Sequence, residues 1–383
     1  MPQLSVAIAS GVTFTNGVSL TQTLATFTDA LLSETSGQLQ ATISWGDGSS
    51  SAGVVSGSAG VFVVSGTHAF TASAGTLEVT VVDTVTGASA STSTAYDARF
   101  KTVFLPEDAA DVTVGPDGNL WLTSQHELMR CTTAGAVTAF PSPAGNQITV
   151  GPDGNLWVAG NNEVLRFTTA GALTEFPLPT TNVTAGGIAA GPDGNLWFTE
   201  RATTYVTIPY FQKLGRITPS GTITEFDLPT ANSGTSSITA GSDGNLWFGE
   251  ESAIKVGKIT TNGAITEFSL TPSPGEPHSI TSGPDGNLWF VGATHVVRLT
   301  PTGTFTAFEV GYSNYRIAPG PDGRLWFTQS GANGKIQAIS TQGVAAEPIQ
   351  LINGMSPGDI VTGPDQAIWF TLHDTTAIVR YVP

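Results

Sequence analysis

The sequence predicts an all-β protein in which a seven-bladed β-propeller follows a smaller β-sandwich. Three observations support this: a repeated heptad, its period of about 40 residues, and a strand missing from the last repeat. The heptad is Gly-Pro-Asp-Gly-Asn-Leu-Trp, with unaltered copies starting at positions 115, 151, 191 and 283, and variant copies starting at 241, 320 and 363. A repeat of this length built from short strands is typical of a propeller blade, so seven copies predict seven blades.

Each repeat predicts four strands, as the copy at 283–289 shows. Before it lies Ser279–Thr281, after it Leu288–Phe290, and then come Val296–Leu299 and Phe305–Phe308. In the turn, Pro fixes φ at the first central position, Asp bonds to its own backbone, and Gly accepts a positive φ. The tryptophan that ends each copy is interpreted as a wedge between neighbouring blades.

The ends of the repeat array predict how the ring closes. The last copy has three strands, Ile360–Thr362, Ile368–Thr371 and Ala377–Tyr381, and the sequence ends before a fourth. Residues 101–105, just before the first copy, resemble the fourth strands of other repeats. We therefore expect residues 101–105 to pair beside 377–381, because closure removes the exposed sheet edges of an open ring.

Residues 1–97 are predicted to form a separate domain, and residues 98–383 to form the propeller. The first 97 residues contain six acidic residues and no Lys or Arg. Short alternating strands separated by Gly-, Ser- and Asp-rich turns predict a β-sandwich. The expected strands are Thr23–Phe27, Leu39–Trp45, Val61–Ser65 and Leu77–Val82.

This first domain resembles PKD domains, an immunoglobulin-like family. The resemblance covers about residues 35–90 and rests on the turn Trp45–Gly48, the segment His68–Phe70 and the strand Leu77–Asp83. It implies a spacer or adhesion module of secreted and surface proteins. Asp47 and His68 are interpreted as structural residues, a turn cap and a hydrogen-bonded strand residue. Trp45 and Phe70 are the core candidates.

Composition limits the classes of partner and location. Only 11% of the 383 residues are charged and the net charge is −16, which argues against a nucleic-acid partner. The single cysteine, Cys131, has no partner for an internal disulfide and is predicted to be a small buried hydrophobe. No stretch suits a membrane span, and no signal peptide is visible at the N-terminus. The composition favours an extracellular or cell-surface protein.

The mouth of the predicted ring, opposite the Pro-Asp-Gly turns, is where a ligand site is expected. Loops after each Trp-Phe and the connections into each first strand lie there. The long loop Ala202–Lys213 is a candidate lid or binding ridge. The candidate residues at this mouth are Glu200, Arg201, Tyr205, Tyr210, Phe211, Glu250, Glu251, Glu276, His278, Tyr315, Arg316, Asp359, His373 and Asp374.

The repeat resembles the streptogramin B lyases, the virginiamycin B lyase group, over about residues 98–383. The resemblance rests on Ile-Thr-x-Gly-Pro-Asp-Gly-Asn-Leu-Trp-Phe, followed by a segment such as Gly215–Thr218 and then one such as Ile223–Pro229. It implies a seven-bladed propeller that opens a macrocyclic depsipeptide by elimination. It also implies Mg²⁺ as the cofactor and His and Glu residues at one mouth of the ring.

The segment Glu276-Pro277-His278 is the sharpest local match to that family. The resemblance implies that Glu276 helps to hold the metal and that His278 is the acid–base catalyst. A second family histidine falls at Ser236, and a family glutamate falls at Gly292 or Ala293. Because Mg²⁺ prefers several oxygen ligands, Glu276 alone would hold it poorly, although Glu250 of the neighbouring blade could contribute.

Two functional hypotheses follow. In the first, which we favour, the protein is a non-catalytic binding or scaffold module that needs no cofactor. Its propeller mouth engages a glycan, a peptide or a protein partner, which includes self-association and neighbouring surface domains. In the second, it is a Mg²⁺-dependent lyase of the streptogramin B type, with His278 as the base.

Overall fold

The fold was analysed in a computed structural model, which describes residues 4–9, 19–29, 35–69, 74–97, 99–202, 212–311, 314–331, 334–351, 355–373 and 375–383. The chain divides into two compact units: Met1–Lys101 with Arg380–Pro383, and Thr102–Val379. The described residues form β-strands, turns and one short 3₁₀ turn, Ser36–Gln38. None of them forms a helix with the length and apolar character that a membrane crossing requires.

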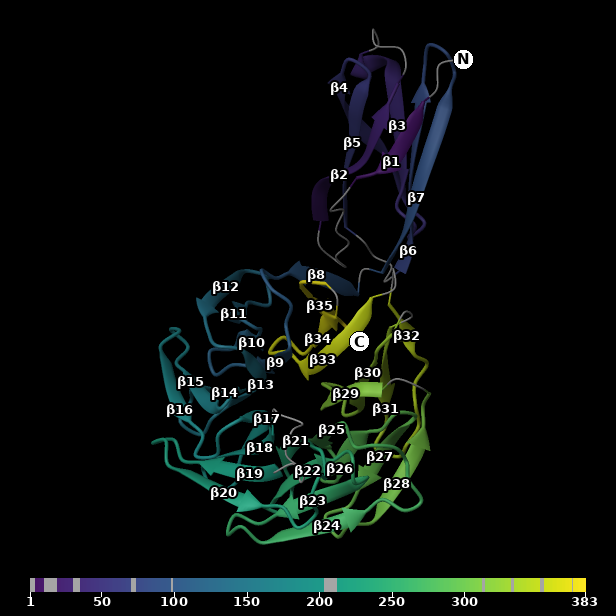
Figure 1. The fold of residues 1–383 in the computed structure, drawn as a ribbon. Coiled ribbons are helices and arrows are strands. Elements are labelled where there is room, and N and C mark those ends of the chain that lie inside the picture. Colours follow the sequence, from purple (N-terminus) through teal and green to yellow (C-terminus); the bar gives the residue numbers. More distant parts are fainter. Residues whose placement is uncertain are drawn as a thin grey trace. The chain divides into compact units, whose positions relative to one another are not determined.

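Seven four-stranded antiparallel sheets are found among the described residues (Figure 1). Blade one contains β9 (Asp111–Val114), β10 (Leu120–Thr123), β11 (Glu127–Cys131) and β12 (Val137–Pro141). Blade two contains β13 (Gly145–Val150), β14 (Leu156–Gly160), β15 (Glu163–Phe167) and β16 (Leu173–Pro177). Blade three contains β17 (Val183–Ala190), β18 (Leu196–Ala202), β19 (Gln212–Ile217) and β20 (Ile223–Asp227).

The remaining blades continue this order. Blade four contains β21 (Thr235–Ala240), β22 (Leu246–Glu250), β23 (Lys255–Ile259) and β24 (Ile265–Ser269). Blade five contains β25 (Ser279–Ser282), β26 (Leu288–Val291), β27 (His295–Leu299) and β28 (Phe305–Glu309). Blade six contains β29 (Asn314–Pro319), β30 (Leu325–Gln329), β31 (Lys335–Ile339) and β32 (Ile349–Gln350). Figure 1 shows the first strand of each blade nearest the centre of the ring.

Blade seven closes the ring with a strand from the other end of the repeat array. It contains β33 (Ser356–Thr362), β34 (Ile368–His373), β35 (Ala377–Tyr381) and, as its outermost strand, β8 (Phe100–Phe104). The Leu105 amide extends this pairing with a hydrogen bond to the Thr376 carbonyl at 2.8 Å. The predicted seven-bladed propeller and its closure by residues 101–105 are therefore confirmed.

The repeated tryptophans are fully buried wedges between blades, as the sequence predicts. Trp121 of blade one packs in one cluster with Ile148 and Val158 of blade two. Its indole Nε1 donates a hydrogen bond to Asp117 Oδ1 of the same turn at 2.9 Å. The same Asp–Trp bond recurs in all seven copies of the heptad. Each turn thus orients the side chain that joins its blade to the next.

A basic residue on the third strand adds a second link between blades. In blade two, the Arg166 guanidinium lies 5.7 Å from the Trp157 ring and 5.5 Å from the Phe176 ring. The same guanidinium donates to the Pro219 carbonyl, in a turn of blade three, at 2.9 Å. Cation–π contact and hydrogen bonding therefore act together at the turn face of the ring.

The N-terminal strands pair differently from the two-sheet sandwich that the sequence predicts. They are β1 (Ser5–Ile8), β2 (Ser19–Thr28), β3 (Leu39–Ser44), β4 (Ser50–Ser58), β5 (Val61–Ala69), β6 (Ala74–Asp83) and β7 (Ser89–Asp97). They form one seven-stranded sheet in the order β1-β2-β5-β4-β3-β6-β7, because β4 pairs with both β3 and β5. The end strands β1 and β7 also contact each other, which gives a nearly closed sheet.

The core of this N-terminal sheet contains Trp45, which is packed against Ile43 and Leu77. His68 stacks on the Trp45 ring with 4.5 Å between centroids, and its Nε2 lies 2.7 Å from Asp47 Oδ2. Asp47 Oδ1 accepts hydrogen bonds from the backbone and the hydroxyl of Ser49. These contacts are the ones expected of structural residues. Phe70, the other predicted core residue, lies outside the described residues.

Candidate functional site

The first strands of the blades bring seven residues of five types to equivalent positions at the centre of the ring. Each of these residues lies four positions before the glycine that begins its heptad. Three of them, Asp111, Ser237 and Asp359, accept a hydrogen bond from a backbone amide of the next blade. Asp111 Oδ2 accepts a hydrogen bond from the Ile148 amide at 2.8 Å, and Asp359 Oδ2 accepts one from the Val112 amide at 2.9 Å. The complete set is Asp111, Gln147, Gly187, Ser237, Ser279, Arg316 and Asp359.

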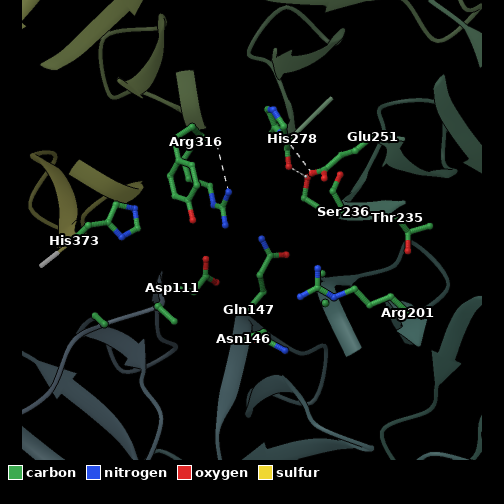
Figure 2. A pocket seen from close by; sticks show the side chains of 16 residues that line it. Asp111, Asn146, Gln147, Arg201, Thr235, Ser236, Glu251, His278, Arg316 and His373 are labelled. Atoms are coloured by element: carbon green, nitrogen blue, oxygen red, sulfur yellow. Dashed lines mark hydrogen bonds and ion pairs between the residues drawn. The ribbon is translucent and has the colours of Figure 1, made fainter. Parts of the chain in front are cut away.

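A cavity of about 630 Å³ opens at the mouth above these residues (Figure 2). All seven blades or the connections into them contribute to its lining, so the site exists only in the closed ring. The described lining residues are Ala109, Ala110, Asp111, Asn146, Gln147, Gly186, Gly187, Arg201, Thr235, Ser236, Ser237, Glu251, His278, Tyr315, Arg316 and His373.

His278 reaches the cavity from the connection before β25, and carboxylates flank both of its ring nitrogens. Its Nδ1 lies 3.3 Å from Glu251 Oε1, and its Nε2 lies 3.9 Å from Glu276 Oε2. The hydrogen bond with Glu251 raises the pKa of His278 above its ordinary value, which favours the imidazolium. The Glu276 side chain is 56% exposed and does not line the cavity.

Ser236 stands where the family resemblance places a second histidine. Its hydroxyl donates a hydrogen bond to the Pro277 carbonyl at 2.9 Å. Ser236 therefore fixes the backbone immediately before His278 and brings no imidazole of its own to the mouth. Gly292, where a family glutamate falls, has no side chain.

A buried acidic pair lies on the opposite side of the mouth. Burial, followed by the nearby Asp359 carboxylate, raises the pKa of Asp111 well above its usual value. Asp359 Oδ1 lies 3.6 Å from Arg316 Nε. The Arg316 guanidinium also covers the Tyr315 ring at 4.2 Å, and that ring meets His373 edge-on at 5.0 Å.

Arg201 and Glu200 are consecutive residues of β18 and point to opposite sides of the strand. Arg201 lines the cavity, and no ion pair of its side chain is found within the described ranges. Glu200 is only 1% exposed and lies away from the cavity lining, opposite Lys213 of β19. Lys213 Nζ is bound instead to Glu225 at 2.9 Å.

Burial therefore leaves two glutamates with raised pKa values just below the mouth. Burial, followed by the Glu225 charge, raises the pKa of Glu200 to about 8. Burial, followed by the Glu267 charge, raises the pKa of Glu250 to about 7. Glu250 occupies the same place in β22 as Glu200 does in β18, and it is likewise fully buried and outside the cavity lining.

The structure brings six of the predicted site residues together around the cavity. They are Arg201, Glu251, His278, Tyr315, Arg316 and His373. The predicted residues Tyr205, Tyr210, Phe211 and Asp374 lie outside the described residues. Sequence reasoning did not single out the lining residues Asn146, Gln147 and Thr235. Aligning the repeats on their glycines would have found the first two, since they occupy the positions of Tyr315 and Arg316.

The Mg²⁺ implied by the family resemblance would need oxygen ligands from these side chains. In the part of the chain that the structure describes, no group of three or more His, Cys, Asp or Glu residues could hold a metal ion. Glu250 is buried outside the lining, and Glu276 lies beside the cavity rather than in it. The described residues do not fit a magnesium site.

Comparison with known proteins identifies the family. The model of the virginiamycin B lyase family matches residues 99–381. The chain belongs to this family. Virginiamycin B lyase from Staphylococcus aureus is 31% identical in sequence, with a TM-score of 0.66, covering 74% of this chain and 99% of that chain. A catalytically inactive variant of the S. aureus enzyme, solved with quinupristin, is 30% identical with a TM-score of 0.66, covering 74% of this chain and 100% of that chain.

A more distant likeness concerns the fold alone. The extracellular domain of a hybrid two-component system protein from B. thetaiotaomicron is 14% identical with a TM-score of 0.61, and the match covers 81% of this chain and 44% of that chain. A search of curated proteins gives no significant match. Membership of the virginiamycin B lyase family therefore rests on the family model and on the solved lyase structures.

Proposed function

We propose that the propeller mouth is a non-catalytic binding site for a polar ligand, in the class of glycan, peptide or protein partners. The observation that carries this proposal is the chemistry of the cavity. Its described lining contains hydroxyl, amide, carboxyl, guanidinium and imidazole groups, and apart from alanine and glycine its most apolar side chain is Tyr315. Ligand pockets for drug-sized apolar molecules are lined mainly by hydrophobic and aromatic side chains. A ligand rich in hydroxyl and charged groups matches this cavity better.

An elimination enzyme is the second candidate, because His278 is retained in a chain of this family. Elimination needs a base at the abstracted proton and a group that stabilises the developing anion. His278, held by Glu251, could accept a proton. The place of the second family histidine is taken by Ser236, whose hydroxyl is occupied by the Pro277 carbonyl. Because Ser236 replaces the second histidine beside His278, the site favours binding over turnover.

The N-terminal unit belongs in this proposal as a spacer. Residues 1–97 are proposed to be a separately folding, PKD-like module that carries the propeller on an extracellular or cell-surface protein. The Trp45–Asp47–His68 contacts and the few charged residues of the chain support this assignment. The partner could be a second copy of this chain or a neighbouring surface protein as well as a glycan.

The test combines a binding screen with a turnover assay. Purified protein is screened against glycans and peptides, and hits are measured by calorimetry with the parent protein and with Ala110→Trp. Ala110 is exposed and lines the cavity, so the indole should fill it without disturbing the blades. We expect hits that bind the parent and lose affinity for Ala110→Trp. Hits that bind both proteins equally would place the binding surface elsewhere and overturn the proposal.

The turnover assay contains a streptogramin B antibiotic and Mg²⁺. We expect a rate lower than that of a competent lyase by on the order of 10³-fold or more, because electrostatic stabilisation of the developing charge is usually the largest catalytic contribution. Turnover that disappears in His278→Ala would establish the lyase instead.

A further inference from the structure

We propose that the mouth recognises the carboxylate of an acidic saccharide, such as a uronic acid unit, and that Arg201 and Arg316 are the residues that bind it. This inference rests on the proposed binding function and names the ligand class of that same site.

The cavity concentrates cations in a strongly acidic protein. The chain has a net charge of −16 and only 14 Lys and Arg residues, and two of these arginines line one cavity. The acidic groups of the mouth are already compensated. Glu251 contacts His278, and Asp359 contacts Arg316. Asp111 is buried and its Oδ2 accepts a hydrogen bond from the Ile148 amide, whereas no ion pair of the Arg201 side chain is found among the described residues.

The two guanidinium groups enter the cavity from different blades. Arg201 comes from β18 of blade three and Arg316 from β29 of blade six, and Figure 2 shows both extending into the cavity near Gln147. Arg316 is held in place by the Tyr315 ring at 4.2 Å and by Asp359. A fixed planar guanidinium loses little entropy when it binds, and its donors match the two oxygens of a carboxylate.

The groups around the arginines favour a saccharide over an acidic peptide. Asn146, Gln147, Thr235 and Ser236 surround the cavity with amides and hydroxyls, the groups that pair with sugar hydroxyls. Among the described lining residues there is no Leu, Ile, Val, Met, Phe or Trp to receive the apolar side chains of a peptide. Tyr315 is the one Phe, Tyr or Trp among the described lining residues, and a sugar ring could lie against the part of its ring that Arg316 does not cover.

The experiment uses calorimetry on the full chain with a galacturonic acid trisaccharide and its methyl ester, which has the same hydroxyls but no charge. We expect the acid to bind, its affinity to fall as salt rises, and the ester to bind at least tenfold more weakly, as the loss of charged hydrogen bonds predicts. Arg201→Gln should weaken acid binding about tenfold or more. Arg316→Lys, which keeps the charge and loses the planar fork, should also weaken it.

The matched control is Arg324→Asn, which removes one positive charge from the turn face and restores the residue found in five other heptads. It should leave the affinity unchanged. Equal affinity for the acid and the ester would overturn the inference while leaving the proposed binding function intact, provided that Ala110→Trp abolishes both. An acidic peptide that binds as tightly as the trisaccharide would overturn the saccharide assignment. If neither saccharide form binds but another ligand binds in an Ala110→Trp-sensitive manner, only the inference fails.

Discussion

The turn face and the mouth face of the propeller are built from the same repeats but by opposite rules. On the turn face, every blade uses the same aspartate to hold the same tryptophan. At the mouth, equivalent positions carry an acid, an amide, a glycine, serines or an arginine. The repeated contacts hold the ring together, whereas the varied ones make a single cavity. Repetition therefore marks the residues of the scaffold, and its absence marks the site.

Along the second strand of each blade, the repeated contacts of the turn face give way to the varied contacts of the mouth. Thr123, Thr199 and Thr328 follow the buried tryptophans by two residues, and each hydroxyl donates to a carbonyl of the next blade. Blade four has Gly249 at this place, and Ser236 makes the corresponding link to the Pro277 carbonyl. The ring is thus still maintained by hydrogen bonds at the mouth, but with different residues in different blades.

The largest expected effect separates the two faces by stability. Trp289→Ala should lower the free energy of unfolding by ~3–5 kcal/mol, because the indole is fully buried between blades five and six and its removal leaves a cavity. Tyr315→Ala at the half-buried mouth should cost only about 1 kcal/mol. Denaturant unfolding of both variants measures the difference. Equal losses would mean that the mouth carries as much of the stability as the wedges do.

A smaller effect concerns pH, because acids on the two faces have opposite shifts. Burial acts to raise the pKa of Asp117, but hydrogen bonds from Asn119 and Trp121 outweigh it and lower that pKa. Burial raises the pKa of Glu200 to about 8. The folded protein thus holds the Glu200 proton more tightly than the unfolded chain does. The resulting stabilisation is complete below the unfolded pKa and is lost as the pH rises through about 8.

Glu200→Gln should therefore stabilise the protein at alkaline pH, since the amide stays neutral where the buried carboxyl must ionise. The gain is expected to be on the order of a few kcal/mol at about pH 9 and to vanish near pH 4. Glu250→Gln should show the same trend from a lower pH, because its pKa is raised only to about 7. Denaturation curves across this pH range give the measurement. A gain for Glu200→Gln that is independent of pH would contradict the buried-acid explanation.

The contrast between the faces also explains how far the sequence could be interpreted. The turn contacts are local: Asp117 bonds to Trp121 four residues away, so a heptad alone predicts them. Ring closure followed from a missing strand in the last repeat. The mouth depends on distant segments, and no local pattern shows that Asp111 meets Asp359. In β18, alternation predicts that Glu200 and Arg201 point to opposite sides of the strand, but only the packed ring shows that Glu200 is buried and Arg201 lines the cavity.

The N-terminal unit gives a second example of this limit. Alternating residues predicted four of its seven described strands and its Trp45 core correctly, because burial of one face is a property of each strand by itself. Which strands pair is decided by edges and connections. The short turn between β4 and β5 joins a hairpin, while β4 also pairs with β3, so one continuous sheet forms where two were expected.

The smallest expected effect tests whether turn-face residues are interchangeable. In the sixth heptad, Arg324 Nε donates to Asp322 Oδ2 at 2.8 Å. In the fifth heptad, Asn287 Nδ2 makes the equivalent bond to Asp285 Oδ2, also at 2.8 Å. Arg324→Asn should therefore keep the turn and change the free energy of unfolding by less than about 0.5 kcal/mol, as for most surface substitutions.

The Arg324 guanidinium also lies 5.5 Å from the Trp326 ring, a contact that asparagine cannot make. At an exposed position such a contact contributes about 0.5–1 kcal/mol at most, and the shorter side chain recovers part of this through its lower entropy cost. Thermal unfolding of parent and variant at two salt concentrations distinguishes the contributions. A loss well above 1 kcal/mol would show that the sixth turn is specialised, and that the division between a uniform turn face and a variable mouth does not hold for blade six.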